Sequence, residues 1–193
     1  MAEQLSEQEG SWLLKLARKN ILDRFEKENK IPGSLETEVS SLVFEKYRGT
    51  FVTLHKKGDL RGCIGNIDPI KTILQGVMDN AGNAAFNDSR FNPLSFEELK
   101  DTIIEISILT PPKNLDYKDS KDLTAKLRPH IDGVIIKKQY KSATFLPQVW
   151  GQLNDPETFL TQLCYKAGLS GEEWRSGDLN VLVYQVQSFQ EKS

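Results

Sequence analysis

The spacing of apolar and polar positions along the chain predicts several helices. The first predicted helix begins at a capping box formed by Ser6 and Glu9. Its apolar positions with helical period are Leu13, Leu14, Ala17, Ile21, Leu22 and Phe25. Ile31-Pro32-Gly33 is a strong helix breaker, so we expect this helix to end near it.

Three further helix starts are marked by N-terminal capping signals. Asp68-Pro69 provides an N-cap and a first-turn proline before a run of apolar residues with helical period. Ser95 and Glu98 form a second capping box. Asp155-Pro156 starts another amphipathic stretch, and Gly168 stands where a helix C′ residue is expected. Helices are therefore expected to begin at each of these positions.

Between the helices, period-two runs rich in β-branched residues predict strands. The predicted strands are Thr50–Leu54, Leu60–Ile64, Ile104–Ile108, Gly133–Lys137, Ser142–Leu146 and a long final strand, Asn180–Gln187. The first two form a hairpin, as do the fourth and fifth, whereas residues 111–127 form a polar, lysine-rich stretch. Hairpins mixed irregularly with helices predict an α+β fold with a mainly antiparallel sheet, flanked by helices.

The overall composition narrows the class of protein. The chain has 193 residues, of which 38% are apolar and 27% charged, which is typical of a globular protein. A formal net charge of −2 disfavours nucleic-acid binding, for which only Lys137-Lys138 and Lys141 give local support. No apolar run reaches the roughly 18 residues that span a bilayer, and the polar N-terminus lacks a secretory signal. We therefore expect a cytoplasmic protein without a membrane segment.

The segment Leu60-Arg61-Gly62-Cys63-Ile64-Gly65 is the strongest candidate site. Its glycines permit unusual backbone conformations and the close approach of a ligand. On a regular strand, Arg61 and Cys63 face the same way, and a guanidinium favours the thiolate. The strand also leads toward the helix start at Asp68-Pro69, where free N–H groups attract anions. The pattern indicates an anion-binding or thiol-reactive pocket; alternatively, Cys63 is a small buried hydrophobic residue.

The remaining reactive side chains give weaker signals. A two-residue turn in the first hairpin would place His55 on the opposite sheet face from Cys63, and only an odd-length turn would bring them together. His130 follows Pro129 in a predicted loop. Cys63 and Cys164 are expected to be free thiols. The cysteines and histidines lack the spacing of a zinc site, so no metal site is predicted, and no nucleotide-binding or hydrolase motif is present.

Several short runs together resemble the AMMECR-one domain family, also called component A of the AmmeMemoRadiSam system. They are Thr50-Phe51-Val52-Thr53-Leu54, Leu60-Arg61-Gly62-Cys63-Ile64-Gly65, Ala84-Ala85-Phe86, Asp88-Ser89-Arg90-Phe91, Leu109-Thr110-Pro111-Pro112, Asp132-Gly133, Thr144-Phe145-Leu146-Pro147-Gln148-Val149-Trp150, Leu163-Cys164 and Lys166-Ala167-Gly168-Leu169. They occur in the family's order and cover nearly the whole chain. Ser89 stands where many members have proline.

The resemblance implies a single domain over residues 1–193, made of a main body with a smaller inserted lobe and a cleft near Leu60–Gly65. It also implies association with a Memo-like protein and a radical-SAM protein, and it specifies no cofactor. In this context Cys63 is a candidate nucleophile. The candidate substrate-binding residues are Arg61, Gly62, Gly65, Asp88, Arg90 and Gln148. Two functions stay open: an enzyme or enzyme component that binds a small anionic or peptide-borne substrate, and a non-catalytic adaptor that binds a partner protein.

Overall fold

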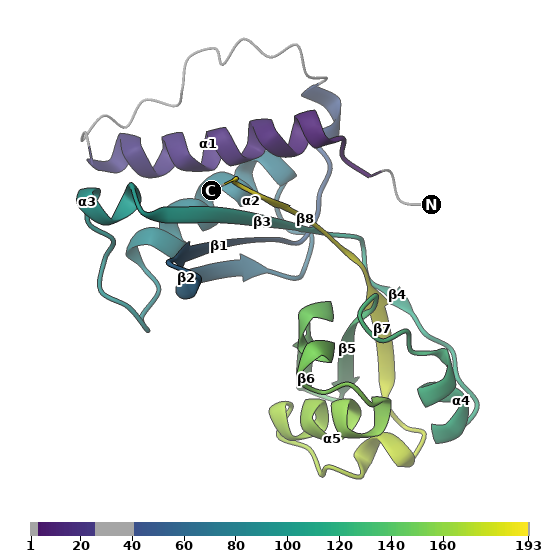
Figure 1. Cartoon of the computed structure of the whole chain (residues 1–193). Helices are drawn as coiled ribbons and strands as arrows, with labels where there is room; N and C mark the ends of the chain where they lie inside the picture. Colours follow the sequence, from purple (N-terminus) through teal and green to yellow (C-terminus); the bar gives the residue numbers. More distant parts are fainter. Residues whose placement is uncertain (1–3, 26–40, 193) are drawn as a thin grey trace. The chain divides into compact units, whose positions relative to one another are not determined.

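A computed structural model describes residues 4–25 and 41–192 of the chain (Figure 1). The chain divides into two compact units. Unit 1 comprises Met1–Leu109 together with Gln187–Ser193, and unit 2 comprises Thr110–Val186. Each unit has its own sheet and its own hydrophobic core, so each is described by itself.

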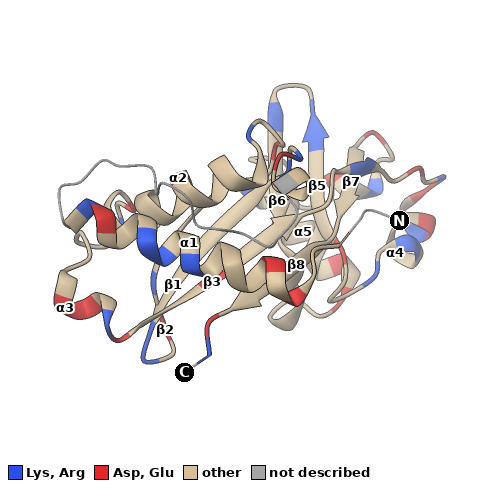
Figure 2. Cartoon of the chain, turned by 90° about the horizontal axis from the view of Figure 1, so that it is seen from above, with Lys and Arg blue, Asp and Glu red and all other residues tan. Residues whose placement is uncertain are grey.

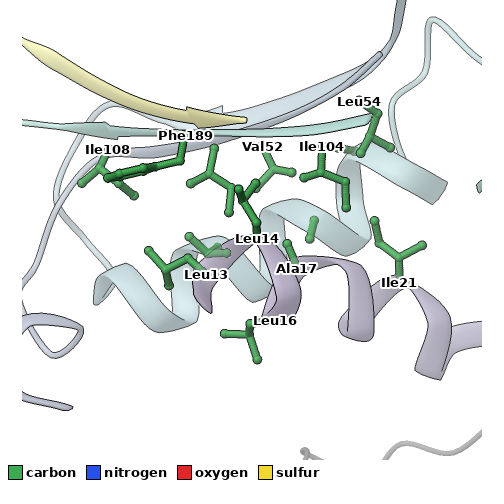
Figure 3. Packing of buried hydrophobic residues seen from close by; sticks show 14 of the residues in the cluster. Leu13, Leu14, Leu16, Ala17, Ile21, Val52, Leu54, Ile104, Ile108 and Phe189 are labelled. Carbon is green, nitrogen blue, oxygen red and sulfur yellow. The ribbon is translucent and has the colours of Figure 1, made fainter. Parts of the chain in front are cut away.

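Unit 1 contains a four-stranded sheet with the strand order β2-β1-β3-β8. Its strands are β1 (Thr50–Lys56), β2 (Asp59–Asn66), β3 (Thr102–Leu109) and β8 (Val186–Gln190). Strand β1 pairs antiparallel with both β2 and β3. The helices are α1 (Glu7–Phe25), α2 (Ile73–Phe86) and α3 (Phe96–Leu99), with a 3₁₀ turn, η1, at Ser41–Val43. Helices α1 and α2 pack against one face of the sheet (Figure 3).

The core of unit 1 lies between that sheet face and the two helices. Figure 3 shows Leu14 and Ile21 of α1 directed toward the sheet side chains Val52 and Leu54. Ile21, Val52 and Leu54 are completely buried. Truncating one such aliphatic side chain to alanine costs about 2–5 kcal/mol. Because side chains alternate along each strand, one row of them lies in this core and the other row lies on the second face of the sheet.

Unit 2 contains the second four-stranded sheet, in which the strand order is β4-β7-β5-β6. Its strands are β4 (Lys113–Asn114), β5 (Gly133–Lys138), β6 (Lys141–Phe145) and β7 (Asn180–Tyr184), and their pairings are antiparallel. The helices are α4 (Ser120–Lys126) and α5 (Pro156–Lys166), with 3₁₀ turns η2 (Pro147–Gly151) and η3 (Glu173–Arg175). In its core, Trp150 stacks on Phe159 with 3.7 Å between ring centroids.

The structure confirms the α+β class and most of the predicted local signals. The capping box at α1 is present, since Ser6 N donates to Glu9 Oε2 over 2.7 Å and Glu9 N donates to Ser6 Oγ. The box of Ser95 and Glu98 opens α3. Asp155 caps α5, and Gly168 follows its C-cap residue with a φ of +70°. The predicted breaker Ile31-Pro32-Gly33 lies outside the described residues.

The predicted helix start at Asp68-Pro69 is wrong. Helix α2 begins at Ile73, and Thr72 is its N-cap, accepting from Gln75 N. The N–H groups of Ile73 and Leu74 donate to backbone carbonyl groups of the segment before β1, at 2.9 and 3.2 Å. The first turn of α2 is therefore already satisfied, and the expected anion site at a free helix N-terminus is not formed.

One other prediction is wrong, and one further segment contains elements that were not predicted. The long strand Asn180–Gln187 is two strands, β7 and β8, which belong to different sheets. A strand can change sheets without a turn residue, so alternation alone does not reveal the boundary. The lysine-rich stretch 111–127 contains the short strand β4 and the helix α4, whose N-cap is Asp119.

Candidate functional site

A β-bulge shapes the candidate segment in β2. The pairing of β1 with β2 passes from Leu54 opposite Gly62 to His55 opposite Leu60, so Arg61 is the extra residue. The turn between the strands contains two residues, because Lys56 pairs with Asp59. A bulge of one residue reverses the facing of everything beyond it. Cys63 consequently pairs with Thr53 instead of lying on the opposite face from it.

Four of the polar side chains on the second face of the unit 1 sheet are neighbours in the strand register, and we call them the polar face: Cys63, Thr53, Glu105 and His55. Thr53 stands between Cys63 on β2 and Glu105 on β3 in the strand register. The Thr53 hydroxyl donates to the Cys63 sulfur over 3.3 Å, and His55 Nε2 lies 3.2 Å from Glu105 Oε2. The hairpin-parity prediction that separated His55 from Cys63 is therefore wrong, because it did not include the bulge.

The outer edge of β2 is held by an ion pair from the loop after α2. Asp88 Oδ2 accepts from Cys63 N over 2.9 Å, and Arg90 Nη2 donates to the Cys63 carbonyl oxygen over 3.2 Å. Arg90 also forms a two-pronged contact with Asp88 through Nε and Nη2, at 3.0 and 2.7 Å. We call this arrangement the edge clamp. It occupies backbone groups that an edge strand otherwise presents to other chains.

Charge pairing dominates the electrostatics of the edge clamp. The Arg90 guanidinium lowers the pKa of the buried Asp88 carboxyl well below its usual range, with help from the Cys63 and Arg90 amides. The Asp88 carboxylate in turn raises the pKa of Arg90. The Arg90 side chain is 54% exposed, and its Nη1 forms no hydrogen bond with a described residue. Asp88 is thus internally satisfied, whereas Arg90 still presents a donor group to solvent.

Arg61 lies in a second charge cluster, with Glu98 and Lys56. Its Nε and Nη2 donate to the Glu98 carboxylate at 3.2 and 3.0 Å, and Lys56 contacts the same carboxylate. These contacts lower the pKa of Glu98 to about 2, Arg61 contributing first and Lys56 second. Nη1 of Arg61 is buried and has no hydrogen-bond partner among the described residues. Phe91 lies near both Arg61 and Arg90, with its ring centroid 5.8 and 5.5 Å from their guanidinium carbons.

Both glycines of the segment are required by close packing inside unit 1. A Cβ on Gly62 would lie 2.2 Å from the carbonyl oxygen of Ala84 in α2. A Cβ on Gly65 would lie 2.2 Å from the ring of Phe51, its cross-strand neighbour. Neither glycine has a positive φ. Their geometry is explained by helix–strand and ring–backbone contact, and their predicted role in ligand approach stays a prediction.

Five of the predicted site residues lie together. Arg61, Gly62 and Cys63 are consecutive on β2, and Asp88 and Arg90 contact the backbone of Cys63. Gly65 follows on the same strand. Gln148 is exposed on η2 of unit 2, and His130 also belongs to unit 2, in a left-handed conformation with φ of +64°.

Three residues of the site were not predicted from the sequence: Thr53, Glu98 and Glu105. Alternation identifies Thr53 and Glu105 as polar positions of their strands. Their joining with Cys63, however, depends on the register across three strands, which no local signal specifies.

The lysines of the β5–β6 hairpin gather near its turn in unit 2 (Figure 2). Lys138 is paired with Glu173 at 2.6 Å, and Lys141 donates to the Gly168 carbonyl group. These contacts weaken the local support for nucleic-acid binding. Within residues 4–25 and 41–192, no three His, Cys, Asp or Glu side chains gather in a way that could hold a metal ion. None of the helices described is both long and apolar enough to cross a membrane.

Comparison with known proteins places the chain among relatives over almost its whole length. The family model described as AMMECR1 matches residues 14–189. The chain belongs to the AMMECR1 family. A protein of Methanothermobacter thermautotrophicus is 39% identical over 97% of this chain and 96% of its own length. Protein MK0488 of Methanopyrus kandleri is 38% identical and is matched over 100% of this chain and 93% of its own.

A solved AMMECR1-like fold supports the architecture. The crystal structure titled Uncharacterized Protein PH0010 from Pyrococcus horikoshii superposes with a TM-score of 0.82 at 31% identity. The match covers 95% of this chain and 91% of that one. The α+β arrangement described above is therefore shared with a relative known by crystallography. The names of these relatives carry no activity, so function has to be argued from the site.

Proposed function

We propose that this AMMECR1 protein is an enzyme or enzyme component that binds a small or peptide-borne substrate at the polar face, with Cys63 as the nucleophile. One observation carries the proposal. Cys63 is half-buried and its sulfur receives a hydrogen bond from Thr53, while its backbone is held by the edge clamp. A sulfur fixed in this way is pre-oriented for reaction, and a donated hydrogen bond favours the thiolate.

Anionic substrates suit the charges around this sulfur. The Arg90 side chain is half-exposed and its Nη1 has no hydrogen-bond partner among the described residues, and Arg61 has a buried Nη1 without a described partner. Guanidinium groups bind carboxylates and phosphates through two parallel hydrogen bonds. Because Asp88 and Glu98 already offset most of this positive charge, the arginines orient a substrate more than they supply affinity.

The family resemblance extends the proposal to partners and compartment. In this proposal the protein acts in the cytoplasm as component A beside a Memo-like protein and a radical-SAM protein. Its substrate enters a cleft near Leu60–Gly65, where Gly62 and Gly65 shape the backbone. Free Cys63 and Cys164 agree with a reducing compartment.

The rate of Cys63 alkylation against pH tests this proposal. Native protein is treated with iodoacetamide between pH 5 and 10, and each cysteine is followed by peptide mass mapping. We expect native Cys63 to be alkylated faster near neutral pH than a free cysteine is under the same conditions. Cys164 is completely buried and serves as an internal control that stays unmodified. A Cys63 that is inert, or that follows the usual profile, would overturn the nucleophilic role.

An adaptor function is the second candidate, and exposed apolar side chains favour it. Leu60 at the start of the segment is 42% exposed, while Tyr47 and Ile70 are 58% and 67% exposed. Adaptor binding to a purified Memo-like protein would survive Cys63→Ser but weaken at least tenfold with Leu60→Ser. Gly62→Val is unsuitable for this test, because its side chain would strike the Ala84 carbonyl group.

A further inference from the structure

His55 and Glu105 form a side-chain pair on the polar face that the proposed function has not yet used. The His55 ring lies 3.2 Å from the Glu105 carboxylate, and both side chains are about three-quarters buried, with exposures of 26% and 24%. The strand neighbours directly opposite His55 are Leu60 and Ile103, which carry no charge. Glu105 is therefore the acidic partner that fixes the orientation of this imidazole.

The bulge at Arg61 puts this pair on the same sheet face as Cys63. Cys63 is directly opposite Thr53, and His55 is two residues beyond Thr53 on the same strand face. Diagonal neighbours of this kind lie about 7–8 Å apart, a separation that an aromatic side chain such as the imidazole reaches across. His55 Nε2 is engaged by Glu105, whereas Nδ1 forms no hydrogen bond with a described residue. A substrate lying over Thr53 would contact the sulfur on one side and the imidazole on the other.

We propose that His55, oriented by Glu105, is the acid–base residue that takes the proton of the Cys63 thiol. This inference rests on the proposed function of Cys63. In the step, the S–H bond breaks and an N–H bond forms at Nδ1, leaving a thiolate and an imidazolium ion. The Glu105 carboxylate offsets the imidazolium charge. The imidazolium then holds the proton that a leaving group requires, which is the usual division of labour between nucleophile, base and orienting carboxylate.

Other charged groups near Cys63 have to be separated from this effect. On the loop side, Arg90 contacts the Cys63 carbonyl oxygen and Asp88 its amide. On β2 itself, Arg61 is paired with Glu98. None of these groups contacts the His55–Glu105 pair, so variants of His55 and Glu105 change the proton acceptor without dismantling either charge cluster.

The first experiment compares alkylation profiles of wild type, His55→Gln and Glu105→Gln. We expect His55→Gln to raise the midpoint for Cys63 by about 1 pH unit or more, which is about a tenfold loss of rate near neutral pH. Glu105→Gln should give a smaller shift in the same direction. His130→Gln, which changes the other histidine in unit 2, is the matched control and should leave the profile unchanged. A His55→Gln midpoint within 0.2 units of wild type would overturn the inference.

A second measurement keeps the test independent of how reactive Cys63 is. The imidazole protons of His55 are titrated by NMR in wild type and in Cys63→Ser, which removes the thiolate and keeps the size of the side chain. If the two groups share a proton, the His55 midpoint falls in the variant; an unchanged midpoint contradicts the pairing. An inert Cys63 in wild type, by contrast, defeats the proposed function itself. Fast Cys63 alkylation that is insensitive to His55 defeats only the acid–base role.

Discussion

Asp88→Asn removes the charge at the centre of the edge clamp with little change of shape. The Asp88 carboxylate accepts from the amides of Cys63 and Arg90, at 2.9 and 3.2 Å, and from two nitrogens of the Arg90 guanidinium. Asparagine keeps one acceptor oxygen and turns an NH₂ group toward these donors. The substitution therefore loses charge-assisted hydrogen bonds and adds a donor–donor contact in a buried position.

The expected loss of stability depends on which of the Asp88 hydrogen bonds contribute to the free energy of unfolding. Hydrogen bonds to a charged group contribute about 1.5–3 kcal/mol each, but they are not additive. Because Arg90 is 54% exposed, its freed guanidinium is rehydrated and its share is small. What is left is the amide of Cys63 and the turn at Arg90, together about 2 kcal/mol. Ser89→Ala, an exposed change in the same loop, is the control and should stay within about 0.5 kcal/mol.

Acid should narrow the difference between the two proteins. The pKa of Asp88 is lower in the folded protein than in the unfolded chain, where a value of about 3.9 is usual. Its stabilisation is therefore complete above that unfolded value and is lost as pH falls toward the folded one. Urea unfolding at pH 7, 4 and 3, combined with hydrogen exchange at the Cys63 amide, measures both effects. A loss below 0.5 kcal/mol at pH 7, or a gap that stays constant down to pH 3, would refute the reasoning.

The remaining predictions concern packing and thiol burial. Gly62→Ala should lower the free energy of unfolding by about 3 kcal/mol in urea, because its Cβ would lie 2.2 Å from the Ala84 carbonyl oxygen. Gly58→Ala is the control: its Cβ would meet open space, and its φ of +88° should cost about 1 kcal/mol. Equal losses for the two variants would contradict the steric explanation. Burial raises the pKa of the Cys164 thiol, so it should resist alkylation in native protein and react once urea unfolds unit 2. Trp150→Phe keeps an aromatic ring against Phe159 but loses the 2.7 Å hydrogen bond to the Asp132 carbonyl oxygen and part of the buried indole volume, so it should cost about 2–3 kcal/mol. A loss under 1 kcal/mol would show that neither the hydrogen bond nor the lost volume matters.

Local signals in the sequence predicted the fold wherever structure depends on neighbours along the chain. The capping box of Ser95 and Glu98 and the Asp155 cap were found because each is a contact within one turn of helix. The start of α2 was misplaced because Asp68-Pro69 carries a stronger cap signal than Thr72, and the backbone carbonyls that satisfy α2 come from an earlier segment. Such tertiary partners are invisible to local patterns.

In the candidate site, too, local signals identified residues but not their tertiary partners. Cys63 and Arg61 stood out because of residue type and spacing, and Asp88 and Arg90 because of the family resemblance. Their actual partners could not be predicted, because the bulge at Arg61 inserts one residue without any proline or positive-φ glycine to mark it. That single residue changes which side chains share a face with Cys63, and it reverses the conclusion about His55.

A crystal structure of the protein after reaction of Cys63 with chloroacetamide tests the central claim most directly. The claim is that the polar face of unit 1 binds substrate beside a nucleophilic Cys63. It predicts an ordered carboxamidomethyl group on the sulfur, lying over Thr53, with its amide within hydrogen-bond distance of His55 or the Thr53 hydroxyl. Absence of an adduct under conditions that modify free cysteine, or an adduct turned away from Thr53 and His55, would contradict it.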